Sequence, residues 1–344
     1  MEENKIIKDL RVLSVDFPPS RIVQRDGQLK ALRDNLNFIL EKKPPRNSFL
    51  YGPPGTGKTC ISQYVVDELR KHAAVNKAYV NCWEYPSKFK ILFSVLQSIG
   101  ETFSIHRKGT PTDELLDILK KRAAEKHVIV ILDEVDRLES LEILYDFLLA
   151  GVFLILISNQ ETAFHEADPR IRSRLSSLDH ISFPPYSIQD VKDILTDRRD
   201  CGLIPGSVKG TQLERIAEKA SGDARVAINI LRMAAEEAEN QDLEKIPDSF
   251  IEKAFPRAEK IPMEDLMAKL SPHQKVALEV ICKKKKIASI PLYHEFGNAL
   301  RQKGLSPIVD RTFRKHLDRL LRFGLVKSEG EGRWKVYYPT QKTP

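Results

Sequence analysis

The sequence predicts an α/β fold, with a parallel, helix-covered sheet first, then a helical domain, and finally helices that lead into a β-hairpin. Three observations predict it. The runs VIVIL at 128–132 and VFLILIS at 152–158 are apolar at every position, as in strands buried on both faces. A glycine-rich loop joins a shorter apolar run to a helical pattern. From residue 187 the periodicity is helical until the last segment.

Short apolar runs alternate with helical patterns along residues 1–186, which indicates βαβ crossovers and a sheet domain. The expected strands are Ser48–Tyr51, Lys77–Asn81, Val128–Leu132 and Val152–Ser158. An amphipathic helix precedes them near Asp26–Leu40, and a second helix, Cys60–Lys71, follows the glycine-rich loop.

The remaining chain divides into a helical domain at 187–260 and a third domain at 261–344. The expected helices of the helical domain are Ile188–Arg199, Gly210–Ala220, Ala224–Glu239 and Asp248–Ala254. In the third domain, three helices, of which Asp310–Phe323 is the last, precede two short strands around Gly330–Gly332.

The composition is that of a soluble globular protein, with 42% hydrophobic and 30% charged residues in a chain of 344. That length exceeds one ordinary core. No apolar run is long enough to span a bilayer, and the first residues lack the apolar core of a signal peptide. The four cysteines form no CxxC pair, which argues against a zinc site or a disulfide framework. These features predict a cytoplasmic protein without a membrane partner.

The formal charge of +7 is concentrated at one end of the chain. Residues 261–344 hold 17 Lys and Arg against 8 Asp and Glu, a net charge of +9, so residues 1–260 carry −2. A basic end on a near-neutral body favours contact with a polyanion. A solvated charged surface is the alternative.

A P-loop pattern, GxxxxGK[ST], occupies residues 52–59. Glycines let such a loop fold back so that backbone N–H groups point at phosphates, and the next helix adds its positive end. Lys58 is expected to reach the β- and γ-phosphates of ATP, and the Thr59 hydroxyl to bind Mg²⁺. The nucleotide-contacting residues, for ATP or ADP, are Gly52, Pro53, Pro54, Gly55, Thr56, Gly57, Lys58, Thr59 and Cys60.

Polar residues follow two of the expected strands where each one ends. Asp133 and Glu134 come directly after VIVIL, and Asn159 ends VFLILISN. The carboxyl ends of parallel strands meet at the ligand edge of a sheet. We expect Asp133 to hold Mg²⁺ through water and Glu134 to orient or deprotonate the attacking water. Asn159 can reach the γ-phosphate, or it can form an Asx turn instead.

These motifs together resemble an AAA+ ATPase and, more narrowly, the archaeal replication initiators related to the origin recognition complex and its cell-division-cycle partner. Besides GPPGTGKT, the resemblance is carried by VIVILDEVD (128–136), LILISN (154–159), DPRIRSRL (168–175), FPPY (183–186) and SGDAR (221–225). The C-terminal segment is similar to the family's winged helix. The resemblance implies an AAA+ sheet domain, a helical lid and a winged-helix domain.

Several roles follow from the resemblance alone. It implies that Tyr186 and Arg198 line the nucleotide site and that Arg225 contacts the γ-phosphate in cis. Residues of the early segment are implied to flank adenine: Pro19, Arg21, Ile22 and Val23. Arg174 is implied to act as an arginine finger toward a neighbour's ATP. Arg170 is the alternative for that role.

The C-terminal domain carries a helix–turn–helix pattern. Residues 307–323 place Phe313, Leu317, Leu320 and Leu321 on an apolar face, and the basic residues lie largely elsewhere. Such a helix is typical of a recognition helix in the major groove. A protein-contact winged helix is the alternative. The expected DNA contacts are Arg311, Arg314, Lys315 and Arg319 on the helix, Arg333 and Lys335 on the wing, and Arg107 and Lys108 in an insertion between Trp83 and Leu119 that the resemblance implies.

The resulting hypothesis is an ATP-regulated protein that binds duplex DNA at replication origins and helps to load the replicative helicase. The resemblance also implies slow ATP hydrolysis, used as a switch, and assembly with other copies or paralogues. Its rivals are a branch-migration motor and an ATP-gated transcription regulator.

Overall fold

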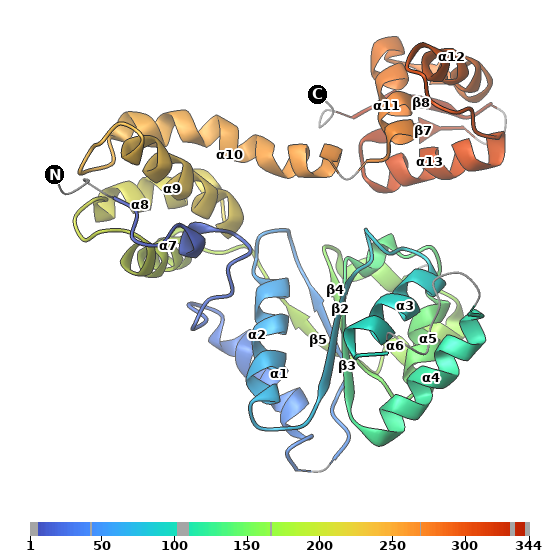
Figure 1. Cartoon of the computed structure of the whole chain (residues 1–344), viewed down its shortest axis with the longest axis horizontal. Helices are drawn as coiled ribbons and strands as arrows, with labels where there is room; N and C mark the ends of the chain where they lie inside the picture. Colours follow the sequence, from blue (N-terminus) through green and yellow to red (C-terminus); the bar gives the residue numbers. More distant parts are fainter. Residues whose placement is uncertain are drawn as a thin grey trace. The chain divides into compact units, whose positions relative to one another are not determined.

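The computed structural model describes residues 6–41, 43–101, 110–165, 167–268, 270–330 and 334–340 (Figure 1). The chain divides into two compact units, Met1–Ala258 and Glu259–Pro344. None of the helices in the described part of the chain combines the length and the apolar character needed to span a membrane.

The first unit is built around a five-stranded sheet in which all neighbouring strands run parallel. The spatial order is β2-β3-β4-β1-β5. The strands are β1 (Ser48–Tyr51), β2 (Asn76–Asn81), β3 (Val128–Asp133), β4 (Phe153–Ser158) and β5 (Asp179–Ser182). The four expected strands lie within one residue of their expected bounds, and the predicted parallel sheet is confirmed.

β5 was not expected from the sequence. Three of its four residues are polar, and only Ile181 is buried. An edge strand paired on one side has little apolar pattern to reveal it.

Helices cover both faces of the sheet (Figure 1). Alternate residues of β3 point to opposite faces: Val130 packs with α3, α4 and α5, while Ile131 packs with α1 and α2. Burial on both faces explains why this strand is apolar at every position before Asp133. The helices are α1 (Asp26–Asn37), α2 (Lys58–Arg70), α3 (Lys88–Ser98), α4 (Thr112–Glu125), α5 (Glu142–Leu149) and α6 (Pro169–Leu175), with short 3-10 turns η1 (Leu10–Leu13), η2 (Val135–Arg137) and η3 (Glu161–Phe164).

Four helices form a second core within the first unit. They are α7 (Ile188–Gly202), α8 (Gly210–Ala220), α9 (Ala224–Glu239) and the start of α10 (Asp248–Ala268). The N-terminal residues pack into this core: Ile6 and Leu13 are buried there, and the Lys8 N–H donates to the Gly202 carbonyl at 2.9 Å. α10 continues well past its expected end at Ala254, although Pro256 and Pro262 lie inside it.

The second unit combines three helices with a small antiparallel sheet of order β6-β8-β7. Its elements are α11 (Pro272–Lys284), β6 (Ile287–Ala288), α12 (Ser289–Gln302), α13 (Asp310–Arg322), β7 (Val326–Glu329) and β8 (Val336–Pro339). Phe296 and Phe313 pack against each other in a tilted arrangement with ring centroids 4.5 Å apart. This order of elements is that of a winged helix, with the β7–β8 hairpin as the wing.

Candidate functional site

Close approach of neighbouring atoms explains two glycines of the loop between β1 and α2. Gly52 has a φ of 145°, and a Cβ there would lie 2.0 Å from the Phe183 carbonyl oxygen. Gly55 has a φ of 75°, and its Cβ would lie 1.9 Å from Asp223 Oδ1. No other residue type fits either position without displacing its neighbour.

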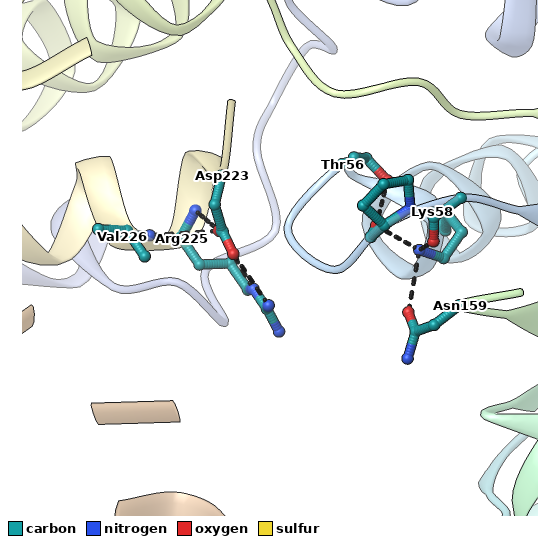
Figure 2. Close-up of polar contacts among 8 residues, drawn as sticks. Thr56, Lys58, Asn159, Asp223, Arg225 and Val226 are labelled. Carbon is teal, nitrogen blue, oxygen red and sulfur yellow. Dashed lines mark hydrogen bonds and ion pairs between the residues drawn. The ribbon is translucent and has the colours of Figure 1, made fainter. Parts of the chain in front are cut away.

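Lys58 begins α2 and is buried, with its ammonium group turned back over the loop (Figure 2). Its Nζ donates to the Gly52 carbonyl at 2.6 Å, to the Pro53 carbonyl at 2.7 Å and to Asn159 Oδ1 at 3.3 Å. Burial lowers the pKa of Lys58 to about 8, and the nearby Asp133 carboxylate acts in the opposite direction. The structure therefore brings Lys58 and Asn159 together.

Asp133 is buried at the carboxyl end of β3. The Thr59 hydroxyl donates to its Oδ2 at 2.6 Å, and the Tyr79 hydroxyl donates to the same atom at 3.1 Å. Burial raises the pKa of Asp133, and the hydrogen bond from Thr59 acts most strongly against this shift. A hydroxyl and a carboxylate are the oxygen ligands that Mg²⁺ takes beside phosphates, so Thr59 and Asp133 fit this ion.

Glu134 follows β3 in the left-handed conformation, with φ 56° and ψ 49°. Its N–H donates to Asp133 Oδ1 at 2.9 Å. A non-glycine residue persists in this conformation only where its surroundings hold it, which is common at functional sites. Asn159 directly follows β4, the strand next to β3, so both residues lie at one edge of the sheet.

The turn before α9 contacts the P-loop from the helical core. The Ala224 N–H donates to the Gly55 carbonyl at 3.2 Å. Asp223 caps α9 by accepting from the Arg225 N–H at 2.9 Å, and the Arg225 guanidinium pairs with the same carboxylate at 3.1 Å. Figure 2 shows Asp223 and Arg225 across from Lys58.

Tyr186 reaches the loop from the segment between β5 and α7. Its hydroxyl lies 2.6 Å from where a Cβ of Gly57 would stand, and its N–H donates to the Gly222 carbonyl at 3.3 Å. Burial raises the pKa of Tyr186, and a hydrogen bond from the Arg25 side chain acts in the opposite direction. Tyr186 thus lies at the P-loop, and its contact with nucleotide stays a prediction.

Arg198 lies buried on α7 and is bonded to the N-terminal segment. Its guanidinium donates to the Val12 carbonyl at 2.8 Å and to the Phe17 carbonyl at 3.3 Å. Burial lowers the pKa of Arg198. Ile22 packs partly buried against the α1–α2 core. Val23 is partly buried and Cys60 is exposed, so a contact of these residues with nucleotide stays a prediction.

Both candidates for an arginine finger are exposed on α6. The Arg174 guanidinium lies 5.9 Å from the centroid of the Tyr145 ring on α5. The Arg170 N–H joins the Asp168 cap of the helix at 2.9 Å. The choice between Arg170 and Arg174 stays a prediction.

α13 separates its apolar and basic residues. The buried residues are Phe313, Leu317 and Leu320, with Leu321 partly buried. Among its basic residues, Arg311, Arg314 and Lys315 are exposed, and Arg319 is partly buried 5.3 Å from the Phe323 ring centroid. On the wing, Lys335 is partly buried and Trp334 is exposed. Three expected contacts, Arg107, Lys108 and Arg333, lie outside the described residues.

Sequence reasoning gave no role to three residues of the site: Tyr79, Asp223 and Arg25. The sequence around Tyr79 does not indicate that its hydroxyl contacts the Asp133 carboxylate on the neighbouring strand. Asp223 stands just before a helical pattern, and that position could have identified it as a helix cap.

The parallel sheet, the P-loop, the acidic end of β3 and the helical core against the loop define an AAA+ ATPase. Sequence profiles agree: an AAA domain matches residues 41–163, and a Cdc6 AAA+ ATPase-type lid domain matches residues 192–256.

Relatives of known name extend the match to nearly the whole chain. It is 36% identical over 337 residues to ORC1-type DNA replication protein 9 of Halobacterium salinarum, covering 97% of this chain and 94% of that protein. It is 38% identical over 294 residues to ORC1-type DNA replication protein 1 of the same organism, covering 85% of this chain and 95% of that protein. The structure of the Aeropyrum pernix ORC1 protein in complex with DNA is similar with a TM-score of 0.79 at 25% identity, covering 100% of this chain and 95% of that one. The chain belongs to the family of ORC1-type DNA replication proteins, which confirms the predicted resemblance.

Proposed function

We propose that this protein is an ATP-controlled initiator that binds duplex DNA at replication origins and helps to load the replicative helicase. Its membership of the ORC1-type family supports the replication role. The observation that carries ATP control is the hydrogen bond from the Ala224 N–H to the Gly55 carbonyl, beside the Asp223–Arg225 pair. Phosphates bound at the loop would act directly on the lid through these contacts.

Their positions support a role for each site residue. Lys58 would offset phosphate charge, Thr59 and Asp133 would hold Mg²⁺, and Glu134 with Asn159 would orient the attacking water. A bound Mg²⁺ would supply further neutralisation of the phosphate oxygens. On γ-phosphate binding, Arg225 would exchange its pairing with Asp223 for the phosphate. Hydrolysis is expected to be slow and to end the ATP-bound state.

Arg174 is proposed to complete the site of a neighbouring copy or paralogue. Its exposure on α6 makes it available to another molecule. An arginine supplied by a neighbouring molecule stabilises the negative charge that develops on the phosphates in the transition state. ATP hydrolysis would then depend on the assembly of several copies along DNA. This assembly is proposed to take place in the cytoplasm, at the nucleoid.

The second unit is proposed to hold the duplex. Its net charge of +9 suits a phosphate backbone, and α13 offers a basic exposed face over an apolar buried one. The expected contacts are Arg311, Arg314, Lys315, Arg319, Arg333 and Lys335. Arg107 and Lys108 are proposed as a contact from the first unit.

DNase footprinting with the purified protein, with and without ATP, tests this function. A defined footprint on an origin fragment, dependent on ATP, is the expected result. Junction binding that ignores sequence, coupled to rapid ATP turnover, would contradict the initiator and favour a branch-migration motor.

A further inference from the structure

Arg25 stands at the N-terminus of α1 in an unusual backbone conformation. Its φ is 102° and its ψ is 25°, and Gln24 before it has a φ of 56°. Two successive non-glycine residues with positive φ are unfavourable and persist only where their surroundings fix them. The contacts of the Arg25 side chain show which surroundings hold this backbone conformation.

The Arg25 side chain lies along the segment that joins β5 to α7. Its guanidinium carbon is 3.9 Å from the centroid of the Tyr186 ring and 5.8 Å from that of Phe183. One terminal nitrogen donates to the Pro184 carbonyl at 2.5 Å. The Nε atom is buried and has no hydrogen-bond partner among the described residues. Stacking on Tyr186 therefore accounts for much of the placement of this side chain.

The neighbours of Arg25 are tied to the lid. The Gln24 amide donates to Asp193 at 2.6 Å, and Arg21 pairs with Asp197 at 2.7 Å, both on α7. Tyr186 in turn contacts Gly57 of the P-loop and Gly222 before α9. Arg25 is thus a point where α1, the P-loop and the lid meet.

We propose that Arg25 is a positioning residue, which holds Tyr186 against the P-loop and so sets the affinity for ATP and links its binding to the lid. The inference rests on the proposed function, in which this loop binds ATP. Arg25 itself needs no contact with the nucleotide for this role.

The test is ATP affinity in Arg25→Gly, because glycine accepts the positive φ and the side chain is removed without straining the backbone. We expect the Kd for ATP to rise about three- to thirtyfold, the range of a cation–π contact, with turnover at saturating ATP unchanged. Arg25→Lys should recover part of the affinity, since an ammonium keeps the charge without the planar face. Arg25→Lys also supplies the test if the glycine variant does not fold.

The chain offers a matched control in Arg33, on the same helix. Its guanidinium carbon lies 6.0 Å from the centroid of the Tyr64 ring on α2, so Arg33 also places a cation over a tyrosine ring. Arg33→Ala should leave the Kd for ATP unchanged.

A double substitution tests whether Arg25 acts on ATP affinity through Tyr186 or independently of it. In a Tyr186→Ala background, Arg25→Gly should add no further loss of affinity. The same loss in both backgrounds, or no loss in either, would overturn the role of Arg25. Wild-type protein that bound no ATP would instead contradict the proposed function.

Discussion

The nucleotide site and α13 both carry charges that the proposed function uses, but the two regions hold these charges in different ways. Lys58 is 6% exposed and makes three hydrogen bonds. The Arg314 side chain is 68% exposed and makes one ion pair, with Asp310. A buried charge interacts strongly with a ligand and needs fixed partners in the protein. Exposed charges are screened by salt, so each contributes little and their effects add up. Single substitutions should therefore have large effects in the nucleotide site and small, cumulative effects on α13.

Arg174 offers the strongest challenge to this comparison, because it is exposed yet proposed to act inside a neighbour's site. Arg174→Ala should slow hydrolysis by about 10³-fold or more where chemistry limits the rate, without changing the ATP affinity of the monomer. Steady-state turnover at increasing protein concentration, on DNA, measures the effect. Arg172→Ala on the same helix is the control. A deficit already present in dilute monomer would remove the role in trans.

Glu134→Gln should lower hydrolysis by about 10²-fold or more while ATP still binds, because the shape is kept and the base is lost. Phosphate release and equilibrium binding measure the two quantities separately. Glu139→Gln, an exposed residue beyond η2, is the control. Mixing Glu134→Gln with Arg174→Ala protein should restore some activity if the two residues serve one shared site. Turnover that survives in Glu134→Gln would exclude Glu134 as the catalytic carboxylate.

Lys58→Ala should weaken ATP binding by well over tenfold, a loss above about 1.4 kcal/mol, since a buried point charge facing the phosphates disappears. Calorimetry measures the affinity. Lys71→Ala, at the exposed end of α2, should bind normally. Equal affinity of Lys58→Ala and wild type would refute the P-loop site.

On α13 the expected effects are the smallest. If Arg314 contacts a phosphate, Arg314→Ala should make the slope of log affinity against log salt shallower by about one, with all sequences weakened alike. Duplex titrations at several salt concentrations give the slope. Arg301→Ala on α12 is the matched control. Unchanged slope and specificity in all the α13 variants would make this face a solvated surface and the unit a protein-docking module.

Local pattern was enough to predict the elements that the site depends on. β3 and β4 are apolar at every position but the last because both faces are covered. The pattern GPPGTGKT, after a strand and before a helix, is typical of a phosphate-binding loop. The same reasoning missed β5, whose polar edge residues obey no burial pattern. It also ended α10 too early, because proline usually interrupts a helix.

The sequence by itself thus determined the P-loop, the acidic end of β3 and the separation of apolar from basic residues on α13, since each depends on residues close together in the chain. Only the tertiary structure decided that Tyr79 reaches Asp133, that Asp223 lies against Gly55, and that Arg25 stacks on Tyr186. Asp223 and Arg25 meet partners about 160 residues away, and such pairings are fixed by how the cores pack rather than by any local preference.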